Sequence, residues 1–269
     1  MGVFQNNLLA GAAAAASAGG AGFYSHQIEQ SLFIPGGGTN GLNRTLGTPT
    51  NEYKVTLSCW IKRTTLGNTN IQEIFKALGS GGGTNTGFDY ATDDKLGVGV
   101  SPTYDGNTTA STLDPVFRDI SAFMHLVFAY DTTDGTATNR VKVYQNGTQL
   151  TGYTTTVAQN HTVAYNQSGT ELYIGRSEGS TYSLNGYIAE VVIIDGQQLA
   201  PTSFAEEKNG VWIPKDPSSL TFGNNGAHLK FENASDLGND SSGNNNDFST
   251  NSLTATNQVL DSPTTGAGS

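Results

Sequence analysis

Acidic side chains on strand-like segments are the residues of this chain that could take part in cutting a polysaccharide. A retaining mechanism needs two carboxyl groups about 5 Å apart beside the scissile bond. The nearest pair on one segment is Glu190 and Asp195, which are five positions apart. Odd spacing on a strand sends two side chains to opposite faces of a sheet. Glu206 and Glu207 fall on a capped turn, where we expect both to be solvated. We therefore predict no catalytic residue and no enzymatic activity.

The residue types that bind transition metals are sparse. The histidines are His26, His125, His161 and His228, and none has zinc-ligand spacing with another histidine or with the single cysteine, Cys59. His125 begins an apolar strand-like run, so we expect a hydrogen-bonded structural role for it. Cys59 lies inside another such run and is predicted to be a small buried apolar side chain. No metal-ligand residues are assigned.

Oxygen-bearing side chains gather in residues 236–247, between Asp236 and Asp247. The segment lacks the residue order of a calcium-binding loop. The favoured interpretation is a turn that links strands, and calcium is the one cofactor that stays open.

Aromatic side chains that alternate with apolar ones are candidates for stacking on sugar rings. In residues 55–62 the apolar set is Val55, Leu57, Cys59 and Ile61, which places Trp60 and Lys62 on the other face. The candidate glycan-binding residues are Trp60, Lys62, Phe88, Tyr90 and Tyr144. The favoured competing interpretation places Trp60 beneath a terminal segment or a neighbouring subunit.

The overall composition favours short strands and argues against two kinds of partner. Of 269 residues, 34 are glycine and only 13% are charged, and the formal net charge is −10. Gly, Asn, Ser and Thr suit turns between short strands. An acidic chain without clustered Lys and Arg is not expected to bind nucleic acid. The apolar run at residues 8–18 is shorter than the roughly 20 residues that cross a bilayer, so no membrane insertion is expected.

Strand-like runs with a period of two dominate the chain after its first 30 residues. They cover residues 31–34, 53–62, 73–77, 87–91, 95–100, 125–130, 140–144, 171–174, 187–194 and 227–232. Many short strands separated by turns predict an all-β sandwich or barrel. Only residues 201–208 look helical in this part, because Ser203 and Glu206 fit a capping box.

Three parts follow from these patterns. Residues 1–30 form a low-charge, Ala/Gly-rich arm, and residues 31–215 form the β-sandwich. Residues 216–269 form a C-terminal segment, in which a strand at about 227–232 completes the sandwich before an acidic Asn/Ser-rich tail.

The arm is apolar and almost uncharged. Such a surface is rarely left exposed on a monomer, and a single short Ala-rich helix is only marginally stable in water. We therefore predict that the arm becomes ordered against copies of itself or a larger assembly; the alternative is an unstructured tail. The predicted assembly residues are Phe4, Leu8, Leu9, Phe23, Tyr24 and Ile28.

Several ordered segments resemble laminin-G-like domains of the concanavalin A-like superfamily. The segments that carry this resemblance are residues 55–62, 123–131, 143–147, 172–175, 184–195 and 199–206. Their order and spacing agree with that family over about residues 30–208. The resemblance implies a concanavalin A-like jelly-roll β-sandwich.

Further segments resemble laminin-G-like proteins of marine tailed phages. They are residues 1–7, 23–30, 194–199, 210–215 and 240–247. This resemblance implies a non-enzymatic virion structural protein, fibre-like or capsid-decorating, that displays the sandwich at the particle surface and contacts host glycans. The implied partners are copies of the chain, with a trimer as the favoured oligomer, and other virion proteins bound through the arm.

Two other functions stay open. A soluble carbohydrate-binding lectin module fits the sandwich but has no need of the arm. A polysaccharide-cleaving enzyme fits the superfamily, but the missing carboxylate pair counts against it.

Overall fold

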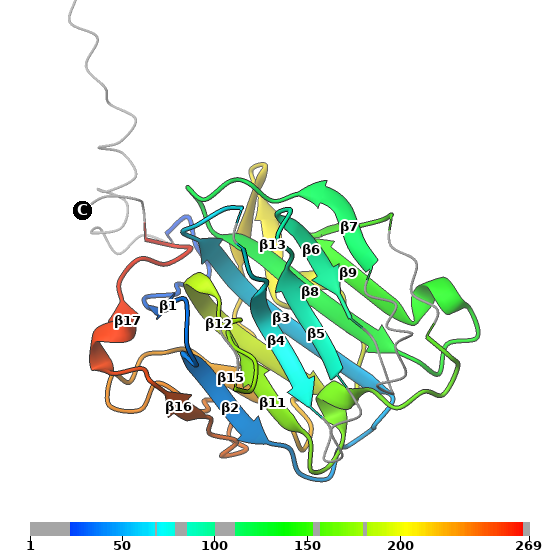
Figure 1. Ribbon diagram of the computed structural model, residues 1–269. Helices are drawn as coiled ribbons and strands as arrows, with labels where there is room; N and C mark the ends of the chain where they lie inside the picture. Colours follow the sequence, from blue (N-terminus) through cyan, green and yellow to red (C-terminus); the bar gives the residue numbers. More distant parts are fainter. Residues whose placement is uncertain are drawn as a thin grey trace, which may run out of the picture.

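Most of the chain folds into two antiparallel sheets that lie face to face (Figure 1). The computed structural model describes residues 22–67, 69–78, 85–99, 111–152, 157–179 and 182–265. Sheet A has the order β10-β9-β8-β3-β12-β1-β17, with β15 also paired to β12. Sheet B has the order β16-β2-β11-β4-β5-β6-β7, and β13 pairs with β14 in a separate hairpin. The predicted all-β jelly-roll sandwich is confirmed.

The elements have these bounds. Sheet A contains β1 (Ser31–Pro35), β3 (Lys54–Arg63), β8 (Met124–Asp131), β9 (Val141–Gln145), β10 (Thr148–Gln149), β12 (Asn185–Asp195), β15 (Ala227–Leu229) and β17 (Gln258–Val259). Sheet B contains β2 (Gly41–Thr45), β4 (Gln72–Leu78), β5 (Asn85–Tyr90), β6 (Lys95–Val98), β7 (Ser111–Val116), β11 (Glu171–Ile174) and β16 (Ser249–Asn251). The hairpin is β13 (Ala205–Lys208) and β14 (Val211–Pro214), and the 3₁₀ turns are η1 (Ala137–Asn139), η2 (Ala164–Asn166), η3 (Pro201–Ser203) and η4 (Ala255–Asn257).

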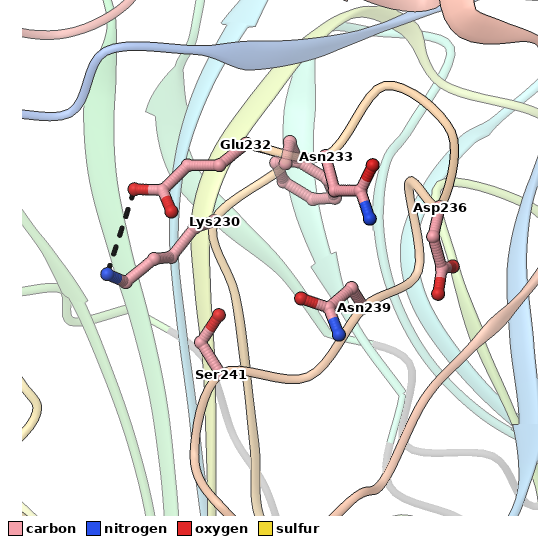
Figure 2. Close-up of a pocket in the computed structure, with 7 residues that line it drawn as sticks. Lys230, Glu232, Asn233, Asp236, Asn239 and Ser241 are labelled. Atoms are coloured by element: carbon pink, nitrogen blue, oxygen red, sulfur yellow. Dashed lines mark ion pairs between the residues drawn. The ribbon is translucent and has the colours of Figure 1, made fainter.

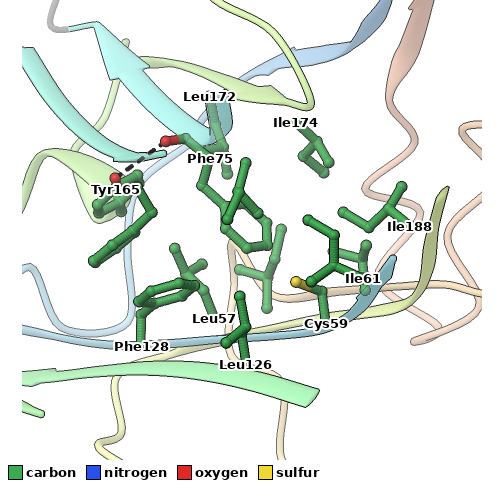
Figure 3. Close-up of a cluster of buried hydrophobic side chains, with 14 of the residues drawn as sticks. Leu57, Cys59, Ile61, Phe75, Leu126, Phe128, Tyr165, Leu172, Ile174 and Ile188 are labelled. Carbon is green, nitrogen blue, oxygen red and sulfur yellow. Dashed lines mark hydrogen bonds between the residues drawn. The ribbon is translucent and has the colours of Figure 1, made fainter. Parts of the chain in front are cut away.

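The main core lies between the sheets and follows the alternation in the sequence (Figure 3). Leu57, Cys59 and Ile61 of β3 all point into it and are fully buried. Phe88 of β5 stacks on Phe128 of β8 with ring centroids 3.7 Å apart, which joins sheet B to sheet A. Burial of these apolar side chains is the main stabilising contribution to the sandwich. The predicted burial of Cys59 is confirmed.

A second apolar layer covers the outer side of sheet A. Val192 and Ile194 of β12 pack there against Phe204 and Phe222. Ile28, from the segment that precedes β1, packs with Trp60, Ala189 and Ala205. Parts of sheet A are therefore buried on both faces, which limits the outer surface that a ligand could reach.

The helix predicted for residues 201–208 is wrong in part. The structure has the single 3₁₀ turn η3 and then the strand β13, which pairs Ala205 with Pro214. Phe204 and Ala205 are buried against sheet A. Packing in the hairpin therefore overrides the local capping signal.

The C-terminal segment closes the edges of both sheets. Beyond the expected strand near residue 227, β17 pairs with β1 and β16 pairs with β2, at the left-hand edge in Figure 1. β16 has three residues and β17 has two, which is too short for a periodic pattern to predict them. None of the described residues forms a helix long and apolar enough to cross a membrane.

Candidate functional site

Trp60 lies on the outer face of sheet A, as the alternation predicted, but only 4% of its surface is exposed. Its ring stacks on His125 of β8, with centroids 4.9 Å apart, and His125 in turn stacks on Trp212 of the β13–β14 hairpin. Ile28 and Ala205 complete the cover. Trp60 is therefore held beneath a terminal segment of its own chain, which was the favoured interpretation, and it presents no open ring to a sugar.

His125 is a neutral structural residue. Trp212 donates its indole N–H to Nδ1 of His125 at 3.0 Å, and Nε2 lies 2.8 Å from the hydroxyl of Ser58. Because an indole nitrogen only donates, Nδ1 must accept and Nε2 carries the proton. Burial lowers the pKa of His125 to about 3. The predicted hydrogen-bonded structural role is confirmed.

A row of partly exposed aromatic rings crosses the outer face next to this covered region. Phe33 of β1 pairs with Tyr187 of β12, and Tyr187 pairs with Lys62 of β3. Phe123 precedes β8, which is the next strand along the sheet. The ring centroid of Tyr187 lies 5.0 Å from that of Phe33 and 6.3 Å from that of Phe123. We call Phe33, Tyr187, Lys62 and Phe123 the aromatic row.

The ammonium group of Lys62 lies between two of these rings. Its Nζ is 4.7 Å from the ring centroid of Tyr187 and 5.1 Å from that of Phe123. The same Nζ forms an ion pair with Asp261, which follows β17. The lysine is thus fixed by cation–π contacts and one carboxylate, while the side chain of Asp261 stays 38% exposed. Rings beside a held, accessible carboxylate can contact both the C–H face and the hydroxyl groups of a sugar.

The structure places the other predicted glycan-binding residues elsewhere. Phe88 and Tyr90 do share a face, but it is the inner one, and both are fully buried in the core. The expectation that they offer rings to a ligand is therefore wrong. Tyr144 lies on the outer face of β9, half-buried against the cluster that contains Val127. Of the predicted set, only Lys62 belongs to the aromatic row.

The sequence analysis did not identify the three rings of the aromatic row or the carboxylate of Asp261 beside it. Phe33 and Tyr187 each stand between inward-facing residues of a strand, so their outward direction was readable from the alternation. Phe123 carried no such signal, because it precedes its strand. Asp261 carried none either, because only the fold brings it beside Lys62.

The described part of the N-terminal arm attaches to its own sandwich. Ile28 is 2% exposed, and its backbone N–H donates to Thr264 Oγ1 at 3.0 Å. Burial within one chain accounts for the position of Ile28, and its role in assembly stays a prediction. Phe23 is 39% exposed and lies edge-on to Tyr24. Phe4, Leu8 and Leu9 lie outside the described residues.

The two carboxylates of β12, Glu190 and Asp195, accept hydrogen bonds that hold parts of the fold together. Glu190 lies at a β-bulge with φ of 47°, and it accepts hydrogen bonds from His26 and His228. Asp195 is 1% exposed and accepts from the backbone N–H groups of Thr50 and Asn225. Neither is free to act on a substrate.

A pair of carboxylates on different strands escaped the sequence analysis. Glu73 of β4 and Asp89 of β5 are directly opposite each other, so they share one face of sheet B. Glu73 has no exposed surface, which keeps a substrate away from it. The pair therefore has the residue types of a hydrolase without the access that hydrolysis needs.

The oxygen-rich segment after β15 forms turns. Asp240 accepts hydrogen bonds from the backbone N–H groups of His228, Ser242 and Asn246. Among the residues that the structure describes, no three His, Cys, Asp or Glu side chains converge in a way that could hold a metal ion. Calcium stays an open expectation.

Comparisons with known proteins agree with this architecture. Residues 36–201 match the family model described as the concanavalin A-like lectin/glucanases superfamily. A search of curated protein sequences gives no significant match. A candidate carbohydrate-binding protein of Bacteroides ovatus is similar in structure, with a TM-score of 0.56 and 15% identity. That match covers 87% of this chain and 60% of the Bacteroides chain.

Two further structures resemble the chain more distantly. The heptameric SAP-like pentraxin of Limulus polyphemus has a TM-score of 0.48 and 18% identity, over 65% of this chain and 80% of its own. The CBM40 module of the Ruminococcus gnavus IT-sialidase has a TM-score of 0.47 and 13% identity, over 65% of this chain and 96% of its own. At such low identity, structural similarity bears on the fold alone.

Proposed function

The chain belongs to the concanavalin A-like lectin/glucanase superfamily, and on that premise we propose that it is a non-enzymatic glycan-contacting protein displayed on the surface of a virion. The observation that carries the glycan contact is the aromatic row. Phe33, Tyr187 and Phe123 are each partly exposed, and they lie on neighbouring strands beside the ion pair of Lys62 and Asp261.

The physical chemistry of the row favours a sugar over other ligands. Aromatic rings contact the C–H faces of pyranoses, and a nearby carboxylate accepts hydrogen bonds from hydroxyl groups. The planes of Phe33 and Tyr187 meet at 41°, so the row is a stepped strip and not one flat platform. Such a strip suits successive sugar residues of a chain, each of which stacks on one ring.

We propose that the chain has no enzymatic activity, because the strand carboxylates Glu190, Asp195 and Glu73 are not accessible to a substrate. Glu190 and Asp195 are held by hydrogen bonds, and Glu73 is fully covered. A glycosidase needs an acid and a second carboxylate that both reach the scissile bond.

Display on a virion is proposed from the resemblance of the arm and the later segments to phage proteins. The described segment before β1 is compatible with this role, because Ile28 and His26 attach it to the sandwich. In this arrangement residues 1–21 bind to other virion proteins or to copies of the chain, and so attach the sandwich to the particle. A trimer remains the favoured oligomer.

Two substitutions and one truncation test the proposal. Tyr187→Ala and Phe33→Ala should each weaken binding on a glycan array by about tenfold, since one aromatic contact contributes roughly 1–1.5 kcal/mol. Phe23→Ala, which removes an exposed ring outside the row, should leave binding unchanged. Equal binding by all variants would remove the basis for a glycan site here.

A chain that begins at Gly22 tests the virion role. It keeps Ile28, so it should remain folded, but light scattering should show a monomer and a particle-incorporation assay should show no uptake. Full incorporation without residues 1–21 would contradict the proposed attachment.

A further inference from the structure

A polar pocket follows β15 at the C-terminal side of the sandwich (Figure 2). Its volume is about 290 Å³. The residues that line it are Lys230, Phe231, Glu232, Asn233, Asp236, Asn239 and Ser241. A pocket at the lower end of the range for small-molecule sites is large enough for one small ring and not for a longer chain.

Several polar groups around this space are uncommitted. The carboxylate of Asp236, the amide of Asn239 and the hydroxyl of Ser241 make no hydrogen bond within the part of the chain that the structure describes. Figure 2 shows the three side chains around one open space. Together they offer a carboxylate acceptor, an amide that donates and accepts, and a hydroxyl that does both.

The loop that carries these groups is held firmly from outside the pocket. The carboxylate of Asp240 accepts three backbone N–H groups, from His228, Ser242 and Asn246. Leu237 and Phe248 anchor the loop in the core, with 3% of each exposed. The backbone of the loop is thus held in place, while the side chains of Asp236, Asn239 and Ser241 are exposed and reach a ligand from it.

Its floor has an unusual backbone conformation. Phe231 has a φ of 60°, which is uncommon for a bulky residue, and it is 2% exposed. Its carbonyl accepts a hydrogen bond from Gln258 of β17 at 2.7 Å. The fold therefore maintains a costly backbone geometry at the base of the pocket.

The charge balance of the pocket selects the ligand. Lys230 lies 3.7 Å from the carboxylate of Glu232, so these two charges offset each other. The free charge is the carboxylate of Asp236, which disfavours an anion. One free carboxylate is also too few for a calcium site, which takes 6–8 oxygen ligands with several charges among them. A neutral ligand rich in hydroxyl groups fits best.

We propose that the pocket formed by Asp236, Asn239 and Ser241 binds the adjacent hydroxyl groups of a single neutral sugar residue. Asp236 accepts hydrogen bonds from two hydroxyls, Asn239 accepts one and donates another, and Ser241 completes the set. The pocket is separate from the aromatic row and rests on the proposed function only for the class of ligand.

Two adjacent residues, Asn257 at the end of η4 and Gln258 at the start of β17, contact both sites. The side chain of Asn257 donates to the carbonyl of Phe33 in the row, and that of Gln258 donates to the carbonyl of Phe231 in the pocket.

The test is an NMR titration of the full chain with methyl glycosides of neutral hexoses and N-acetylhexosamines. We expect at least one of them to shift the backbone amide signals of residues 230–241, with a Kd on the order of 1 mM. Asp236→Asn and Asn239→Ala should each weaken this binding by about tenfold, the effect of losing one hydrogen bond to a ligand. Glu207→Gln, which neutralises an exposed acid outside the pocket, should not.

Three results would overturn the inference: no shift of these signals by any glycoside, equal binding by the pocket variants, or shifts caused by calcium chloride alone that chelation reverses. Asp236 and Ser241 are both exposed, so should Asp236→Asn fail to fold, Ser241→Ala provides a second comparison. Tyr187→Ala should leave this titration unchanged, so loss of the row and loss of the pocket are distinguishable.

Discussion

Two buried glutamates, one on each sheet, have opposite electrostatic environments. Glu190 lies at a β-bulge of β12 in sheet A, and Glu73 lies at a β-bulge of β4 in sheet B. Both are almost inaccessible, with 6% and 0% exposure. The pKa of Glu190 falls to about 2, whereas that of Glu73 rises to about 8.

Hydrogen bonding explains the difference. Burial raises the pKa of both carboxyls, but hydrogen bonds from His228 at 2.6 Å and His26 at 3.1 Å outweigh it at Glu190. At Glu73 burial dominates. Its close partner is Lys76, whose Nζ lies 3.0 Å from Oε1 in an ion pair, while neither oxygen accepts a well-formed hydrogen bond.

The cross-strand neighbour makes the environment of Glu73 less favourable still. Asp89 faces Glu73 on β5, and burial raises its own pKa to about 6. Equal burial therefore has opposite consequences, because the fold supplies two donors to one carboxylate and a second acid to the other. Glu190 links the segments that carry His26 and His228 through hydrogen bonds. Ionisation of Glu73, by contrast, is expected to lower the stability of the fold.

The largest effect is expected from Glu190→Gln. Removal of the charge leaves His26 and His228 without their shared anion, so the free energy of unfolding at pH 7 should fall by about 3–5 kcal/mol. The contribution of Glu190 is present above its unfolded pKa of 4.5 and is lost as the pH falls toward about 2. Urea unfolding at pH 7 and pH 3 measures both. A change below 1 kcal/mol, equal to that of the exposed control Glu207→Gln, would break the comparison.

Glu73→Gln should act in the opposite direction. The stability associated with protonated Glu73 is complete below pH 4.5 and is lost as the pH rises through about 8. The glutamine does not ionise, so the variant should be more stable than the parent by roughly 1–3 kcal/mol at pH 9, with little difference at pH 5. Thermal unfolding at the two pH values checks this. Asp89→Asn should give a smaller gain in the same direction, and destabilisation by both variants at pH 9 would show that the ionised groups are stabilised in an unrecognised way.

The smallest effect is expected from His26→Ala. The hydrogen bond to Glu190 raises the pKa of His26, against a smaller opposing effect of burial, and the charges of Asp216 and Lys230 also act on it. Its contribution is therefore complete below pH 6.5 and is lost as the pH rises through the folded-state pKa. Because the ring is only half-buried, we expect a loss of about 0.5–1 kcal/mol at pH 6 that shrinks at pH 9. Hydrogen exchange of residues 26–30 would show whether the segment detaches, and a loss that is independent of pH would argue against the charged contact.

The alternation of residue types determined most of the sandwich from the sequence. In β3 it gave the inward side chains Leu57, Cys59 and Ile61, and it also placed Trp60 and Lys62 on the outer face. The Asn146-Gly147 turn between β9 and β10 is equally local, since Gly147 has a φ of 80° that few other residues adopt. Periodicity and turn preferences depend on residues close together in the chain, so both can be recognised in a single sequence.

Periodicity did not reveal which face of a strand meets the other sheet or what covers it. Phe88 and Tyr90, two of the candidate glycan-binding residues, share a face of β5, yet that face is the core. Trp60 lies outside but is covered by Ile28 and the β13–β14 hairpin, which are far from it in the chain. A period of two shows which residues share a face of a strand, but it does not show which face packs in the core.

Only the tertiary structure decided the candidate sites. The aromatic row joins positions 33, 62, 123 and 187 through the register of neighbouring strands, and Asp261 reaches Lys62 because β17 pairs with β1. The bulge at Glu190 turns this side chain toward two histidines, against the simple alternation of a regular strand. Long-range pairing and local bulges depend on the packing of the whole sandwich. The contacts between residues distant in sequence therefore cannot be predicted from the sequence of one segment.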